Sequence, residues 1–192
     1  MRLFVAIELG EQVVREAAKL VDELRKRADR RSKAARLGWV TPDRMHLTLR
    51  FLGEVNDERA GDVLGSLRDS MPMAPFEIVW QGLGAFPPKG PPRVFWVGAG
   101  RGRDKVLELE ELVSARLDPL GFERESRPYA PHLTLARVRE AGGLRPAPLF
   151  DGIAERSLGT TNVDAITLFQ SKLSPKGPTY VSLQRTPLRR VG

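Results

Sequence analysis

The sequence predicts an α+β fold, with two pseudo-symmetric lobes of antiparallel sheet, helices on the outside and a central cleft. Three observations lead to this prediction. Strand-like and helix-like segments are mixed without the steady alternation of a parallel βαβ sheet. The order of the segments restarts in the second half of the chain, and the tetrapeptide His-Leu-Thr-Leu occurs once in each half, at residues 46–49 and 132–135. We therefore expect residues 1–192 to form a single domain whose halves meet near residues 84–93.

The first half is expected to run strand, helix, strand, helix, strand. Alternating apolar side chains near the N-terminus are typical of a strand, and the apolar positions that follow recur with helical spacing. Asn56 stands where a helix N-cap is expected. The expected elements are residues 2–9, 10–24, 45–52, 56–67 and 76–80. The basic run at residues 25–36 breaks the helical pattern, so we expect a solvated loop there rather than an RNA contact.

The second half repeats this order after a cluster rich in Pro and Gly. That cluster, residues 86–92, suits neither a helix nor a central strand and is the expected boundary between the halves. The turn at residues 174–178, Ser-Pro-Lys-Gly-Pro, has the residue types of a hairpin. Strands are expected at residues 93–98, 132–138, 163–173 and 179–185, and an amphipathic helix at residues 105–117.

Composition limits the function. The chain has 31 Lys and Arg against 24 Asp and Glu, a net charge of +7, which favours an anionic partner such as nucleic acid. It has no Cys and two His, which excludes a disulfide framework, thiol catalysis and zinc fingers. The N-terminus lacks the apolar core of a signal peptide, and no apolar stretch approaches the roughly 18 to 20 residues of a membrane span. We therefore expect a cytoplasmic protein with no membrane association.

Both histidines begin the same tetrapeptide, and the copies lie 132 − 46 = 86 residues apart. At average residue usage, Leu-Thr-Leu follows a given His in roughly one case in a few thousand, so the pair is an internal repeat. In a strand, His46 and Thr48 share one face while the leucines share the other. His132 and Thr134 follow the same rule. Two such strands facing each other would place two imidazoles and two hydroxyls around one small volume.

This set of side chains suits phosphodiester transfer on a ribose without a metal. One imidazole can accept a proton while the other donates one, near neutral pH, and the threonine hydroxyls can donate hydrogen bonds to phosphate oxygens. A single strand His is more often a packed structural residue, and Thr is common in strands; the duplication favours catalysis. A metal site is disfavoured because neither motif brings an Asp or Glu to the same face.

The chain resembles the two-histidine phosphoesterase superfamily and, within it, the bacterial and archaeal RNA 2′,3′-cyclic phosphodiesterases, historically called 2′-5′ RNA ligases (LigT-like). The resemblance extends over essentially the whole chain. It rests on the ordered segments MRLFVAIEL, WVTPDRMHLTLRFLGEV, RVFWVG, RPYAPHLTLAR and LFQSKLSPKGPTYVSLQRTPL. It implies a bilobal α+β fold, hydrolysis of a terminal ribose 2′,3′-cyclic phosphate to a 2′-phosphate, and no metal or nucleotide cofactor.

The resemblance also implies roles for the motif residues. His46 would donate a proton to the departing ribose 3′-oxygen, and His132 would accept a proton from the attacking water. Thr48 and Thr134 would hold the phosphate oxygens. The symmetry of the sequence itself does not decide which histidine is the acid. The implied partners are RNA ends with a 2′,3′-cyclic phosphate, tRNA-derived ends among them, and no obligatory protein partner is evident.

Three further residues are expected to bind substrate. Arg127 lies in a Pro-stiffened segment before the second motif, where its guanidinium would reach phosphate or RNA, although a surface Arg ahead of a strand is the alternative. Simple alternation places Arg50 on the face of the first motif, as a positive lining. Tyr129 is expected to stack a base. Phe86 and Trp96 are further stacking candidates, and core packing explains them equally well.

The same residues are compatible with other functions. Ligation of RNA ends through a 2′-5′ linkage would use the same site in reverse. A non-catalytic module that binds RNA ends would not require two proton-transfer groups. Other branches of the superfamily act on 2′-5′ oligoadenylates and cyclic ADP-ribose derivatives.

Overall fold

The computed structural model describes residues 1–175 and 177–190. Within these residues, nine strands form two antiparallel sheets, one of four strands in the order β3-β1-β8-β9 and one of five in the order β2-β6-β5-β4-β7. The strands are β1 (Arg2–Glu8), β2 (Arg36–Trp39), β3 (His46–Glu54), β4 (Phe76–Phe86), β5 (Val94–Ala99), β6 (His132–Glu140), β7 (Ser157–Val163), β8 (Ala165–Lys172) and β9 (Thr179–Pro187). The helices are α1 (Glu11–Arg31), α2 (Asp57–Ser66), α3 (Arg103–Leu117) and α4 (Pro146–Phe150), with short 3-10 turns at Pro42–Arg44 and Asp118–Leu120. The predicted α+β class with antiparallel sheets is confirmed.

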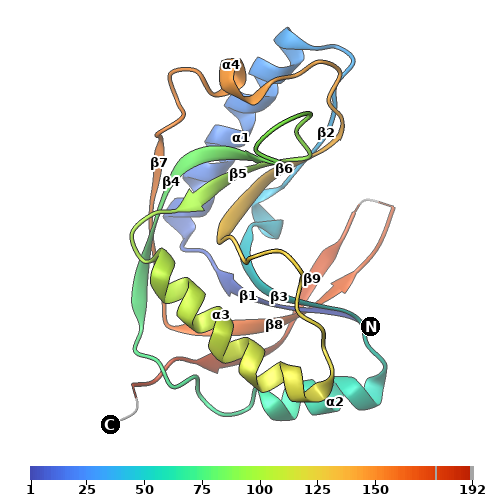
Figure 1. Ribbon diagram of the computed structural model, residues 1–192, viewed down its shortest axis with the longest axis vertical. Helices are drawn as coiled ribbons and strands as arrows, with labels where there is room; N and C mark the ends of the chain where they lie inside the picture. The colour runs from blue at the N-terminus through green and yellow to red at the C-terminus, as the bar shows by residue number, and fades with distance from the viewer. Residues whose placement is uncertain (176, 191–192) are drawn as a thin grey trace.

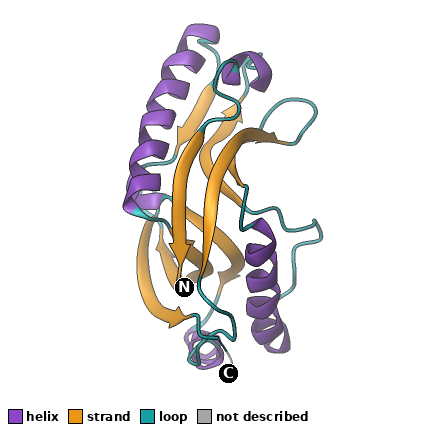
Figure 2. Ribbon diagram, turned by 90° about the vertical axis from the view of Figure 1, so that its left-hand side faces the viewer, coloured by secondary structure: helices purple, strands orange, loops and turns teal. Residues whose placement is uncertain are grey.

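The two sheets lie one above the other in Figure 1, with the five-stranded sheet on top. The two long helices lie on opposite sides of the strands (Figure 2). Helix α1 packs on β6 and β7 of the five-stranded sheet, and α3 packs on β3 of the four-stranded sheet. Each long helix therefore follows a strand of one sheet, β1 or β5, and covers the other sheet.

The sequence halves do not coincide with the two sheets. The Pro/Gly cluster at residues 86–92 lies in the connection between β4 and β5, which pair with each other in the five-stranded sheet. Strand β4, from the first half, thus joins β5 and β6, while β8 and β9, from the second half, join β1 and β3. The cluster, where we expected the halves to meet near residues 84–93, connects two neighbouring strands of the five-stranded sheet.

Helix α1 is longer than predicted. Residues 25–31, assigned to a loop because of their charge, continue the helix to Arg31. The apolar spacing persists, since Leu24 and Ala28 are both buried, and the basic side chains occupy the exposed side. Strands β2 and β7 were not predicted, because neither has a continuous apolar pattern. The expected 174–178 turn joins β8 to β9, but its residue 176 lies outside the described part of the chain.

The remaining expected strands and helices are present with boundaries shifted by a few residues. The predicted cap is confirmed, because the Asn56 side chain accepts a hydrogen bond of 2.9 Å from the Arg59 backbone N–H. Among the described helices, none has both the length and the apolar character needed to cross a membrane.

Candidate active site

The two motifs lie on β3 and β6, which contact each other although they belong to different sheets. Both strands have the same burial pattern from the histidine onward: the leucines of each motif are buried and the His and Thr side chains are half-buried. The leucines pack in the core. The alternation predicted for His46, Thr48, His132 and Thr134 therefore matches the structure, and the contact between their strands brings the two motifs to the same part of the molecule.

Each imidazole is held by the backbone carbonyl two residues before it. His46 Nδ1 lies 2.9 Å from the carbonyl oxygen of Arg44, and His132 Nδ1 lies 2.7 Å from that of Ala130. A carbonyl oxygen only accepts, so this contact assigns the proton of each neutral ring to Nδ1. Nε2 then carries the lone pair in both rings. The repeated contact fixes ring orientation and tautomer in both motifs.

Burial lowers the pKa of both histidines and so favours their neutral forms. It lowers the pKa of His46 to about 4, opposed by the hydrogen bond to Arg44 and reinforced by the positive charge of Arg137. Burial also lowers the pKa of His132, opposed by the Ala130 carbonyl and again reinforced by Arg137. Both rings start as proton acceptors, and a bound anion would favour protonation of either one.

A bulge in each motif strand changes which later residues face the site. In β3 the pairing with β1 slips at Leu49, so that Leu49 and Arg50 are both buried. In β6 the pairing with β5 slips at Leu135, so that Leu135 and Ala136 are both buried. The residue five positions after each His therefore returns to the His/Thr face. These residues are Phe51 and Arg137, both exposed.

Arg137 is a functional candidate that strict strand alternation does not predict. It lies on the strand of the second motif, and its charge acts on His46, His132 and Tyr180 together. A guanidinium near both imidazoles is suited to hold phosphate oxygens. Strict alternation placed residue 136 on the site face instead, and a bulge after the motif leaves no plain signal in a single sequence.

The structure does not bring Arg50 to the His/Thr face. Its side chain is 5% exposed and donates to Ser114 Oγ at 2.8 Å and to the Phe122 carbonyl at 2.7 Å. It also forms an ion pair of 3.1 Å with Asp118 and lies 3.9 Å from Glu110. Arg50 therefore anchors β3 to α3 and to the segment that follows it, instead of lining the site.

Tyr129 and Arg127 lie in the segment that leads into β6. The Tyr129 hydroxyl donates to the backbone carbonyl of Thr48 at 2.8 Å, and its ring packs against the core. Burial raises the pKa of this hydroxyl. Its hydrogen bond ties the segment before the second motif to the strand of the first, and its expected role in stacking a base stays a prediction. Arg127 is exposed beside the second motif, and its role in binding phosphate or RNA stays a prediction.

Aromatic rings surround both histidines. Tyr180 lies edge-on to His46 at 5.1 Å, and Phe86 lies edge-on to His132 at the same distance. Trp96 lies 6.4 Å from His132 and covers Gly84, where an added Cβ atom would overlap the indole. These rings cover part of each imidazole and so contribute to the burial that lowers the two pKa values.

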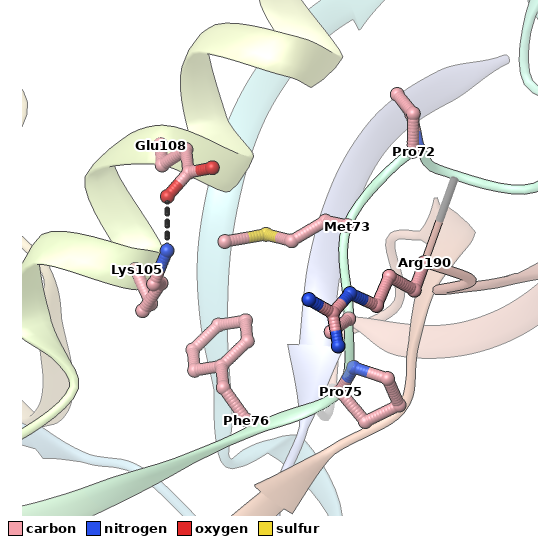
Figure 3. A pocket seen from close by; sticks show the side chains of 8 residues that line it. Pro72, Met73, Pro75, Phe76, Lys105, Glu108 and Arg190 are labelled. Atoms are coloured by element: carbon pink, nitrogen blue, oxygen red, sulfur yellow. Dashed lines mark hydrogen bonds and ion pairs between the residues drawn. The ribbon is translucent and has the colours of Figure 1, made fainter. Parts of the chain in front are cut away.

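The cavity drawn in Figure 3 is a separate feature with a volume of about 390 Å³. Its lining includes Met73, Phe76 and Arg190, together with Lys105 and Glu108, which pair at 2.7 Å. None of the motif residues lines it. Among the described residues, no group of three His, Asp or Glu side chains is arranged to hold a metal ion.

Comparison with known proteins identifies relatives along the whole chain. A curated RNA 2′,3′-cyclic phosphodiesterase of Archaeoglobus fulgidus is 33% identical over 96% of this chain and 98% of its own length. One of Thermus thermophilus is 36% identical over 98% of this chain and 91% of its own.

Solved structures agree with these relatives. The crystal structure of TT0787 of Thermus thermophilus matches 99% of both chains with a TM-score of 0.79 and 32% identity. That of Escherichia coli LigT complexed with 3′-AMP matches 98% of both chains with a TM-score of 0.71 and 25% identity. The family description "LigT like Phosphoesterase" matches twice, at residues 12–96 and 97–180, one match for each half of the repeat. This chain therefore belongs to the LigT-like phosphoesterase family.

Proposed function

We propose that this protein hydrolyses RNA or nucleoside 2′,3′-cyclic phosphates to 2′-phosphates by acid–base catalysis between its two histidines. The observation that carries the proposal is the matched pair of imidazoles, each with Nδ1 held by a backbone carbonyl and Nε2 available for proton transfer. Relatives along the whole chain have the name RNA 2′,3′-cyclic phosphodiesterase, which supports the same substrate here.

In the proposed reaction, His132 Nε2 accepts a proton from water as the water oxygen forms a bond to phosphorus. The bond between phosphorus and the ribose 3′-oxygen breaks, and His46, protonated at Nε2, donates its proton to that oxygen. The products are a 2′-phosphate and a free 3′-hydroxyl, and the reaction needs no oxidant and no reactant other than water. The roles of donor and acceptor follow the family resemblance.

Three groups would stabilise the charge that develops on the phosphate oxygens. The hydroxyls of Thr48 and Thr134 donate hydrogen bonds, and Arg137 adds a full positive charge. The substrate also affects the protonation state of the histidines. Its negative charge raises the pKa of a nearby imidazole, so binding would favour uptake from solvent of the proton that the free, buried His46 lacks at pH 7.

The natural substrate is, on this proposal, an RNA end in the cytoplasm, tRNA-derived ends among them. The net charge of +7 supports a polyanionic partner. Arg127 is exposed five residues before the second motif, which supports a contact of its guanidinium with the RNA chain beside the terminal phosphate.

The identity of the product tests the proposal. Purified protein incubated with adenosine 2′,3′-cyclic phosphate should yield 2′-AMP, separated from 3′-AMP by chromatography. Formation of 3′-AMP would overturn the assigned leaving group, and binding without turnover would support a module that only binds RNA ends. The same site could join RNA ends in reverse, and incubation of two defined RNA ends would show which direction prevails at equilibrium.

A further inference from the structure

The cavity of Figure 3 lies where three segments far apart in the sequence meet. These segments are the approach to β4, the first turns of α3 and the C-terminal segment after β9. The volume of about 390 Å³ is within the range of pockets that bind small molecules. None of the motif residues lines the cavity, so a ligand bound here would be separate from the proposed catalytic centre.

Main-chain hydrogen bonds hold two of these segments together. Met71 and Leu188 form a parallel bridge, and both the N–H and the carbonyl of Met71 form hydrogen bonds of 2.9 Å to the residues that flank Leu188. Both side chains are buried in the core. Met73 and Arg190 lie two residues beyond this bridge on either segment, so the backbone that carries them into the cavity is already fixed without a ligand.

One wall of the cavity is apolar. It is formed by residues 72–76, which are Pro, Met, Ala, Pro and Phe. Met73 is 5% exposed and lies in the core, and the half-buried Phe76 packs against the core. The Met73 thioether adapts its shape to a neighbouring group, and the Phe76 ring is flat and rigid. This wall is therefore suited to the apolar body of a ligand.

Three charged side chains complete the lining, and their charges do not cancel. Lys105 and Glu108, both on α3, pair with each other at 2.7 Å. Arg190 lies across the cavity from this pair (Figure 3), and no carboxylate of the described residues forms an ion pair with it. The cavity thus has one uncompensated positive charge, and a guanidinium binds a carboxylate through two parallel hydrogen bonds.

We propose that this cavity binds a small carboxylate with an apolar body. Arg190 binds the carboxylate oxygens, and the apolar body packs against Met73 and Phe76. A ligand with a single negative charge fits best, because the carboxylate of Glu108 would repel a second one. This inference goes beyond the proposed function and does not depend on it, since no residue of the proposed reaction takes part.

A titration with 3-phenylpropionate, which has one carboxylate and one ring, tests the proposal. Nuclear magnetic resonance of the backbone amides would follow the binding of this probe, of the uncharged 3-phenylpropan-1-ol and of acetate, which lacks the apolar body. We expect 3-phenylpropionate to bind with a dissociation constant of about 1 mM or tighter and to shift the amide signals of Met73 and Phe76. The alcohol and acetate should each bind at least about 5-fold more weakly, because each lacks one of the two contacts.

Variants locate the charge that the probe uses. Arg190→Ala should weaken binding of 3-phenylpropionate about 5-fold or more. The matched control is Arg189→Ala, an exposed neighbour that does not line the cavity, and it should bind within about 2-fold of the unaltered protein. Arg137→Ala, which alters the proposed catalytic site, should also leave binding of the probe within about 2-fold. Because Arg190 is exposed, its variant should keep the melting temperature of the unaltered protein, which a thermal scan checks.

Three results would overturn the proposal. They are the absence of saturable binding of 3-phenylpropionate, equal binding of the uncharged alcohol, and loss of binding in Arg137→Ala with none in Arg190→Ala. The last result would show that the probe binds at the catalytic site. Turnover of cyclic nucleotides enters none of these measurements, so this inference and the proposed function can each fail without the other.

Discussion

The hydroxyl of Tyr129 donates a hydrogen bond of 2.8 Å to the main-chain carbonyl of Thr48, although the two residues belong to opposite halves of the chain. Thr48 holds the phosphate in the proposed reaction, and Tyr129 lies three residues before His132. The bond therefore sets the position of one motif relative to the other. Tyr129 acts in this account as a positioning residue.

Tyr129→Phe removes this bond and keeps the ring. We expect kcat on a 2′,3′-cyclic nucleotide to fall roughly 3- to 10-fold with KM nearly unchanged, because one hydrogen bond is worth about 1 kcal/mol and the loss affects alignment more than binding. Steady-state kinetics and a thermal scan check this. Unchanged kcat in Tyr129→Phe would show that the bond does not position the motif.

Arg50 should matter for stability. Arg50→Ala leaves Glu110 and Asp118 without their buried partner, so we expect the free energy of unfolding to fall by roughly 3 kcal/mol, the lower end for breaking a buried pair because Asp118 is partly exposed. Urea denaturation measures it. The matched control is Arg101→Ala, which removes an exposed pair with Glu77 and should cost less than about 1 kcal/mol. Similar losses in the two variants would contradict the buried role.

Arg137 should matter for catalysis. Arg137→Ala removes the positive charge shared by both histidines, and we expect kcat to fall about 10²- to 10³-fold, as for the loss of one group that stabilises transition-state charge. Arg139→Ala, an exposed arginine farther along β6, is the control and should change kcat on a mononucleotide less than about 3-fold. If both variants behave alike, the charge at position 137 has no special role.

The pH dependence follows from the lowered pKa values of the two histidines. Catalysis requires one neutral and one protonated imidazole, and in the free protein the pKa of His46 is about 4 and that of His132 lies below its usual value of 6.5. The profile of kcat/KM, which reports the free enzyme, should therefore fall on the alkaline side with a midpoint below pH 6.5. The alkaline fall of the kcat profile should have its midpoint at a higher pH than that of kcat/KM, because the bound phosphate stabilises an imidazolium. A kcat/KM profile still rising at pH 7 would contradict this.

Arg137→Gln tests how the charge of Arg137 affects the pKa values of the two histidines. Burial is the larger cause of both lowered pKa values, and Arg137 lowers them further. Removing the charge of Arg137 should raise both pKa values and move the kcat/KM profile toward higher pH. A shift toward lower pH would show that Arg137 does not act on the imidazoles in this way.

Much of the fold and the centre of the site could be predicted from the sequence. The His-Leu-Thr-Leu repeat predicted two equivalent strands, because a strand that buries both leucines presents His and Thr on its other face. The sequence could not predict that β4 joins the sheet of β5 and β6, or that β8 and β9 join the sheet of β1 and β3. Strand pairing of this kind depends on long-range contacts. The bulges at Leu49 and Leu135 were missed for a local reason: a single extra residue reverses the alternation, which moves Arg50 into the core and Arg137 into the site.

The central claim is that two histidines, and no metal, carry out the reaction. Its most direct test is the turnover of a 2′,3′-cyclic nucleotide in excess EDTA by the unaltered protein, His46→Ala, His132→Ala and the double variant. We expect the unaltered protein to remain active, each single variant to lose about 10²- to 10⁴-fold, and the double variant to be little worse than either. Loss of activity on chelation, or a single variant with nearly full turnover, would contradict the account.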